Sequence, residues 1–282
     1  MQAFVNLVLM LVPSIISSPQ SAAAEGGPGL RKLGEGVYAA LDASGGSNAG
    51  FIILKDAVVV VDSRANEAEA RELLQQIKGV TDRHVKFVIN THHRGDHCGG
   101  NAVFVADGAS VLAWNKCAEL MAGNRELPPQ GQATVVFDGK VTIPSAIRDV
   151  EIIPIGPANT PGDTMIYLRR EGILFAGGVL FAGRYPFMRD GSTTEWIKAL
   201  RAIEELNPKM IVPGRGALAS VQDVVKERRY FEDLRSEVGR LIQEGLSLEE
   251  VQKRATTRVN NWEWEDRLRA GNIEKVYGEL KR

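Results

Sequence analysis

Apolar positions recur along the first half of the chain with two different periods, which predict strands and one helix. The expected strands span residues 36–43, 50–54, 57–61 and 85–90. The valine run within 57–61 is typical of a strand that is buried on both faces. Asn66, followed three residues later by Glu69, indicates a capped helix start, and Gly79 indicates the end of that helix.

The second half repeats this order of strands followed by helices. Strands are expected over residues 134–137, 150–155, 164–168, 173–176 and 210–212, and helices over 194–206 and 262–280. A long amphipathic helix is expected to begin at Ser220 with Asp223 in the capping position, and Ser247 with Glu250 marks the start of another. Blocks of strands followed by helices predict an α/β fold with two sheets packed face to face and helices outside.

The first 24 residues differ from the rest of the chain. An apolar run from Ala3 to Ile16 is too short to span a bilayer as a helix. Small residues follow it, and they predict a signal peptide cleaved after Ala24. Because no Lys or Arg precedes the run, an N-terminal helix kept in the mature protein is the alternative. The prediction is therefore one domain over residues 25–282, periplasmic or secreted, with no stable membrane insertion after processing.

Composition narrows the choice of partners. The 282 residues carry a formal net charge of −1 and no long run of one sign, so nucleic acid is not an expected partner. The oligomeric state is not predicted. Cys98 and Cys117 are too few for a disulfide-built scaffold, and they are interpreted as two buried thiols, with pairing in an oxidising compartment as the alternative.

The expected strand at 85–90 runs directly into Thr-His-His-Arg-Gly-Asp-His-Cys-Gly-Gly (91–100). A strand end holds side chains rigidly, and the glycines let the next helix begin close to them. This segment resembles the metallo-β-lactamase superfamily signature T-H-x-H-x-D-H-x-G-G. Three further segments resemble later motifs of that family in the same order, namely Ala-Asn-Thr-Pro-Gly-Asp (158–163), Leu-Phe-Ala-Gly-Gly-Val-Leu-Phe (174–181) and Val-Pro-Gly-Arg-Gly (212–216). The resemblance implies a four-layer αβ/βα sandwich, here with a helical C-terminal extension from about residue 217.

The resemblance also implies a set of positions for two zinc ions. The first zinc would be held at the positions of His92, Arg94 and Asn159, the second at those of Asp96, His97 and Arg215, and the bridging aspartate is replaced by Gly178. Only His92, Asp96 and His97 remain as ligands of the family's type. Because a catalytic zinc keeps three protein ligands, and an arginine has no lone pair to donate, at most one weakly bound zinc is expected.

The substitutions suggest a different use for the site. If Arg94 and Arg215 point inward, Asp96 is expected to pair with one or both of them. The remaining positive charge, with Asn159 as a hydrogen-bond donor, would suit a carboxylate or a phosphate. A purely structural salt bridge in a dead cavity is compatible with the same residues.

Two functions follow from this interpretation. The first is an inactive or chemically altered hydrolase homologue that binds a small anion or a partner protein. The alternative is a hydrolase of an ester, lactone, thioester or β-lactam, working with one weak metal or with Asp96 and His97 as acid–base groups.

Four other residues are assigned structural roles. His93 is expected to point away from the site because alternate residues of an extended segment face opposite ways. Asp62 is interpreted as a structural residue beneath the site, and Trp262 and Trp264 as helix packing.

Overall fold

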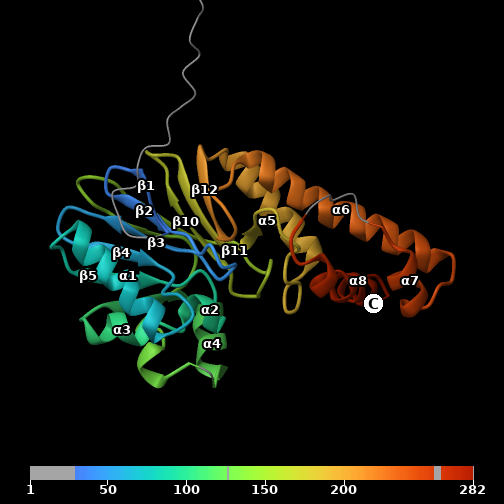
Figure 1. Cartoon of the computed structure of the whole chain (residues 1–282), viewed down its shortest axis with the longest axis horizontal. Helices are drawn as coiled ribbons and strands as arrows, with labels where there is room; N and C mark the ends of the chain where they lie inside the picture. Colours follow the sequence, from blue (N-terminus) through green and yellow to red (C-terminus); the bar gives the residue numbers. More distant parts are fainter. Residues whose placement is uncertain (1–28, 126, 257–261, 282) are drawn as a thin grey trace, which may run out of the picture.

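A computed structural model describes residues 29–125, 127–256 and 262–281 of the chain. The expected signal peptide, residues 1–24, lies outside these ranges. Among the described helices, none combines the length and the apolar character needed to cross a membrane. The described residues form two sheets flanked by helices, and a group of helices extends from one side of the sandwich (Figure 1).

The first sheet contains seven strands in the order of the sequence. They are β1 (Leu30–Gly34), β2 (Val37–Ala40), β3 (Ala49–Ile53), β4 (Val58–Val61), β5 (Val85–Ile89), β6 (Ser110–Trp114) and β7 (Val135–Phe137). From β4 onward the pairing is parallel, so the carboxyl ends of β4, β5 and β6 meet at one edge. The connecting helices are α1 (Glu67–Val80), the short α2 (Gly95–Cys98), α3 (Asn101–Ala106) and α4 (Asn115–Gly123).

The second sheet has the order β12-β11-β10-β9-β8. Its strands are β8 (Val141–Ile143), β9 (Val150–Pro154), β10 (Thr164–Leu168), β11 (Ile173–Phe181) and β12 (Met210–Arg215). Only the pair β11 and β12 is parallel, because α5 (Thr193–Leu206) connects them. The chain then continues as α6 (Val221–Gln243), α7 (Leu248–Arg254) and α8 (Glu265–Leu280).

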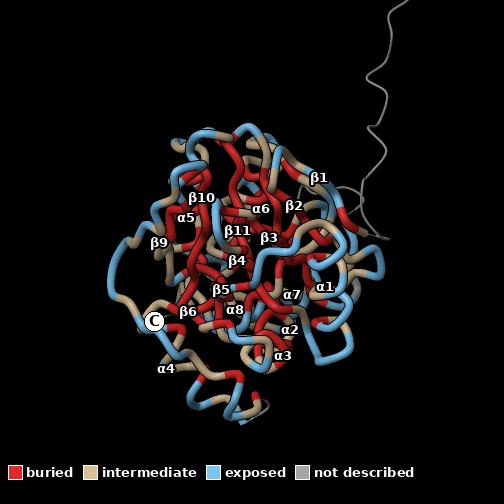
Figure 2. The backbone as a smooth tube through the Cα atoms, turned by 90° about the vertical axis from the view of Figure 1, so that its left-hand side faces the viewer, coloured by how far each residue is buried: buried red, intermediate tan, exposed pale blue. Residues whose placement is uncertain are grey.

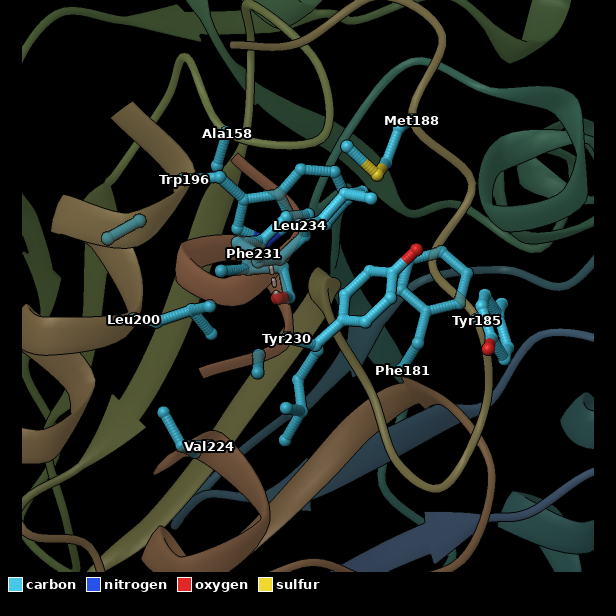
Figure 3. Close-up of a cluster of buried hydrophobic side chains, with 14 of the residues drawn as sticks. Ala158, Phe181, Tyr185, Met188, Trp196, Leu200, Val224, Tyr230, Phe231 and Leu234 are labelled. Atoms are coloured by element: carbon cyan, nitrogen blue, oxygen red, sulfur yellow. Dashed lines mark hydrogen bonds between the residues drawn. The ribbon is translucent and has the colours of Figure 1, made fainter. Parts of the chain in front are cut away.

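Side-chain alternation along the strands separates three apolar layers. In β4, Val59 and Val61 face the second sheet, whereas Val58 and Val60 pack toward α1 and α3. The strands are accordingly buried at the centre of the molecule, with exposed loops around them (Figure 2). The third layer joins the second sheet to α5 and α6 through an aromatic cluster that includes Trp196 (Figure 3). The αβ/βα sandwich with C-terminal helices is confirmed.

Most expected elements are present, and the differences have local causes. Asn66 caps α1 as predicted, but Gly79 does not end the helix, which continues to Val80 because Gly79 does not adopt the left-handed conformation of a helix-ending glycine. β11 is longer than expected and reaches Phe181. The helix predicted over 262–280 begins only at Glu265 because the preceding segment pairs with the loop after β11.

Candidate functional site

The residues singled out in the sequence meet at one edge of the sandwich. His92, Asp96 and His97 follow β5. Asn159 lies in the loop between β9 and β10, and Arg215 ends β12. Together they line a cavity of about 230 Å³. Its lining residues are Gly45, His92, Arg94, Asp96, His97, Asn159, Phe181, Phe187, Arg215, Trp264, Arg267 and Leu268.

Asp62 anchors both imidazoles of the site from beneath. This buried residue follows β4 with a φ of 57° and accepts hydrogen bonds from the Thr91 N–H at 2.8 Å and the Thr91 hydroxyl at 2.7 Å. It also accepts from His97 Nδ1 at 2.7 Å. Because the Thr91 hydroxyl hydrogen is used by Asp62, its oxygen accepts from His92 Nδ1 at 3.0 Å. His92 therefore keeps Nε2 as the nitrogen with a free lone pair, whereas His97 lies between two carboxylates, with its Nε2 3.6 Å from Asp96 Oδ2. Asp62 has the structural place expected for it.

The two imidazole rings lie with their centroids 4.3 Å apart. His92 is 1 % exposed, and burial lowers its pKa well below the ordinary value, with a further contribution from His97 and the nearby arginines. His92 is consequently neutral near pH 7 and presents a lone pair rather than a charge.

Asp96 pairs with Arg215, one of the two partners expected for it. The Arg215 Nη2 group contacts Asp96 Oδ2 directly, and its Nη1 donates to the Gly45 carbonyl at 3.1 Å. Burial alone would raise the pKa of Asp96, but the charges of His97, Arg215 and Arg94 together lower it. Asp96 therefore stays ionised as the counter-ion of Arg215.

Arg94 takes a different partner from the one considered in the sequence. Its guanidinium pairs with Asp190 at 3.0 Å and lies 5.0 Å from the centroid of the Phe187 ring. Asp190 and Phe187 belong to the loop between β11 and α5. The sequence of this loop has no periodic pattern from which its conformation could be predicted. Arg94 thus lines the cavity, but its counter-ion, Asp190, does not belong to the cavity lining.

Asn159 is fully buried between this loop region and β11. Its Nδ2 donates to the Gly178 carbonyl at 2.8 Å, and its Oδ1 has no partner among the described residues. A Cβ atom on Gly178 would lie 2.9 Å from Asn159 Nδ2 and 3.0 Å from His92 Cε1. The glycine thus provides the space that Asn159 and His92 occupy. One amide hydrogen of Asn159 is committed to the backbone rather than to a ligand.

Three lining residues that the sequence did not place in the site, Trp264, Arg267 and Leu268, come from the start of α8. Trp262 packs edge-on against Tyr185, and Trp264 also packs against the apolar layer of the C-terminal helices, as expected, but the sequence did not predict that Trp264 lines the cavity as well. Trp264 turns toward the cavity, and Arg267 follows it on the first turn of α8. In the sequence, the only sign that these residues could belong to a site was that Trp264 and Arg267 stand among acidic residues where a helix begins.

The neighbouring side chains behave as expected. His93 lines a larger neighbouring cleft, which shares Arg94, Asp96 and Phe187 with the cavity, and does not line the cavity of His92 itself. Cys98 and Cys117 are free and buried, which confirms the interpretation as two thiols. In the described part of the chain, no group of three or more His, Cys, Asp or Glu side chains could hold a metal ion.

Comparison with known proteins identifies the family of the chain. Residues 43–215 match the model of the metallo-beta-lactamase superfamily. The chain belongs to that superfamily. A metallo-beta-lactamase from Pontibacter korlensis superposes with a TM-score of 0.66 at 20% identity, covering 72% of this chain and 98% of that one. The sec-alkylsulfatase Pisa1 from Pseudomonas sp. superposes with a TM-score of 0.72 at 14% identity, covering 89% and 50%. These two likenesses concern the superfamily fold alone.

Two curated relatives carry activities in their names. The alpha subunit of 2,4-dinitroanisole O-demethylase from Nocardioides sp. (strain JS1661) is 31% identical over 162 residues, which are 56% of this chain and 48% of the relative. A hydroxyacylglutathione hydrolase from Synechococcus sp. (strain JA-3-3Ab) is 28% identical over 119 residues, 42% of this chain and 44% of the relative. The chain spans about half the length of these relatives, and it is a hydrolase-like member of the superfamily.

Proposed function

We propose that this protein binds a small anionic molecule in the cavity at the strand ends, and that it does so without the zinc pair of its superfamily. The observation that carries the proposal is the charge of the cavity lining. Among the described lining residues, Arg94, Arg215 and Arg267 contribute three guanidinium groups and Asp96 contributes a carboxylate, while Asp190 pairs with Arg94 from outside the lining.

The cations of this region repel one another. Burial lowers the pKa of Arg215, and the nearby Arg184 and Arg94 lower it further against the opposing effect of Asp96. An anion that enters the cavity would relieve this repulsion and would meet donors with the geometry of a carboxylate or phosphate. Arg267 is exposed, so it can meet the anion first.

The donor groups of the cavity do not fit a zinc pair. His92 offers one lone pair, His97 lies between the carboxylates of Asp62 and Asp96, and Asp96 is already held by the Arg215 guanidinium. Arg94 and Arg215 stand among these donors as fixed positive charges, which disfavour a divalent ion in the same space. The loss of metal ligands is therefore part of the proposal.

Isothermal titration with acetate, inorganic phosphate, sulfate and benzoate tests anion binding, on protein purified without chelator and analysed for zinc. We expect one anion per chain to bind and well under one zinc per chain. Arg267→Gln should weaken anion binding about tenfold, since a hydrogen bond to a charged group is worth about 1.5 kcal/mol or more. Arg229→Gln, which removes an exposed arginine of α6 outside the cavity lining, is the matched control.

Two results would overturn the proposal. One is that no anion of the panel binds, and the other is that two zinc ions are held tightly. Turnover of a generic ester or β-lactam by the unmodified protein would favour the hydrolase alternative instead.

A ligand-restored variant tests the metal part separately. Arg94→His, Asn159→His, Gly178→Asp and Arg215→His together rebuild the ligand set that the resemblance implies, so this variant should take up zinc and gain thermal stability when zinc is added. A folded variant that takes up no zinc would show that these four residues are not what excludes the metal.

A further inference from the structure

The segment that carries Trp264 is fixed to the loop after β11 at three points. The Glu263 N–H donates to the Gly183 carbonyl at 3.1 Å, and the Tyr185 N–H donates to the Glu263 carbonyl at 3.0 Å. The Glu263 carboxylate also pairs with Arg184 at 2.7 Å. This short bridge ties the start of α8 to the loop that follows β11. The position of Trp264 is therefore set by the body of the fold.

The backbone of Trp264 is strained. Its φ of 69° lies in the left-handed region, which a bulky residue rarely adopts. The bridge at Glu263 supplies the contacts that maintain this conformation. As a result the indole lies on the cavity wall, while its neighbour Trp262 packs into the aromatic cluster with Tyr185 and Tyr230.

Cations surround the indole of Trp264. The guanidinium carbons of Arg184, Arg215 and Arg267 lie 5.0, 5.7 and 5.9 Å from the centroid of its ring. Arg184 and Arg215 are held by carboxylates, whereas Arg267 is exposed and can leave the indole without breaking an ion pair between described side chains. A flat ring could take its place against the indole, while the guanidinium turned to the negative group of the same molecule.

The rest of the lining favours a ligand of this kind. Phe181 and Phe187 add two further aromatic walls, and Leu268 adds an aliphatic one. The cavity of about 230 Å³ is smaller than the range of about 300–1,000 Å³ found for drug-sized ligands, so it suits a single ring. Aromatic walls with a guanidinium at the mouth match a molecule that is flat and apolar at one end and anionic at the other.

We infer that the ligand is a planar aromatic carboxylate and that Trp264 is the specificity-determining residue on which its ring stacks. This inference rests on the proposed function, because it assumes that the cavity binds an anion. It adds that the C-terminal helices, which lie beyond the residues matched by the family model, select which anion binds.

The experiment compares benzoate with cyclohexanecarboxylate, which carries the same charge on a puckered ring of similar size. Calorimetry on the full chain should show benzoate binding about tenfold more tightly, a difference of about 1.4 kcal/mol, since stacked aromatic rings attract one another beyond the effect of the area they bury. Trp264→Leu should bring the ratio of the two affinities close to one while cyclohexanecarboxylate still binds. Trp264→Phe should restore part of the preference for benzoate.

Trp262→Phe is the matched control, since this neighbouring indole does not line the cavity. Its affinity ratio should equal that of the unmodified protein. Benzoate should quench tryptophan fluorescence in the unmodified protein and in Trp262→Phe, but not in Trp264→Leu.

The outcomes separate the two proposals. If the unmodified protein binds no anion, the proposed function fails and this inference fails with it. If anions bind but benzoate has no advantage, or if folded Trp264→Leu and Trp264→Phe both keep the full advantage, the inference is overturned and the anion site stands.

Discussion

Replacing the buried carboxyl group of Glu227 should remove part of the loss of stability that the protein undergoes as the pH rises. Glu227 lies on α6 inside the apolar layer beside the second sheet and is 1 % exposed. Its Oε2 accepts a hydrogen bond from the Phe181 N–H at 2.8 Å, and its Oε1 has no partner among the described residues. Burial raises the pKa of Glu227 from 4.5 to about 8. The ionised carboxylate is therefore disfavoured in the folded protein.

The sign of the effect follows from comparing the folded and unfolded chains. Below pH 4.5 the carboxyl of Glu227 is protonated in both states, so the folded protein bears no cost. As the pH rises, the unfolded chain ionises first, and stability falls until the pH passes the folded pKa of about 8. At about 1.4 kcal/mol for each pKa unit, this one residue should remove about 4 kcal/mol of stability between about pH 5 and about pH 9.

Glu227→Gln keeps an acceptor for the Phe181 N–H and cannot ionise. Its free energy of unfolding, measured by urea denaturation, should match the unmodified protein at about pH 5 and exceed it by about 4 kcal/mol at about pH 9. Glu205→Gln, at an exposed acidic residue of α5, should show no such divergence. If the difference between Glu227→Gln and the unmodified protein stays within about 1 kcal/mol over this range, the carboxyl is not desolvated and the reasoning is refuted.

Three further results are expected. Asp62→Ala removes the acceptor of three buried hydrogen bonds and should lower the free energy of unfolding by about 3–5 kcal/mol, and a loss below about 1 kcal/mol would contradict the anchor. Gly178→Asp alone should cost about 1–3 kcal/mol because its Cβ meets Asn159 Nδ2 at 2.9 Å, so an unchanged melting temperature would be inconsistent with this contact. Cys98 and Cys117 should resist a thiol reagent in the native protein, since burial raises the pKa of both thiols, and rapid labelling without denaturant would show that they are accessible.

The sequence located the core of the site because each of its residues was tied to a strand end. The motif at 91–100 placed His92, Asp96 and His97 after β5, and the short turns at 158–163 and 212–216 brought Asn159 and Arg215 to the same edge. Strand ends are fixed by hydrogen bonding within the sheet, so motif spacing translates directly into position.

The sequence did not predict the part of the cavity wall that Trp264 forms. Trp264 enters the cavity because residue 263 pairs with the loop after β11, a contact between segments about eighty residues apart. Local periodicity across 262–280 indicates only a helix and contains no information on that contact. The pairing of Arg94 with Asp190 could not be predicted either, because it depends on the path of the irregular loop that carries Asp190.

The histidine pair has a reason to be present that requires no metal. Asp62 needs donors for its buried oxygens, and His97 and Thr91 supply them, while His92 gives its Nδ1 hydrogen to the Thr91 oxygen. Removing the His97 imidazole would take one of the two hydrogen bonds of Asp62 Oδ2, and removing the His92 imidazole would leave the Thr91 oxygen with its bond to Asp62 alone. Each loss is expected to cost about 0.5–1.5 kcal/mol. Two histidines and an aspartate in a superfamily motif are therefore weak support for zinc by themselves. The charges around them matter as well, and the guanidinium groups of Arg94 and Arg215, each paired with a carboxylate, are the reason why we propose an anion rather than a zinc pair as the ligand.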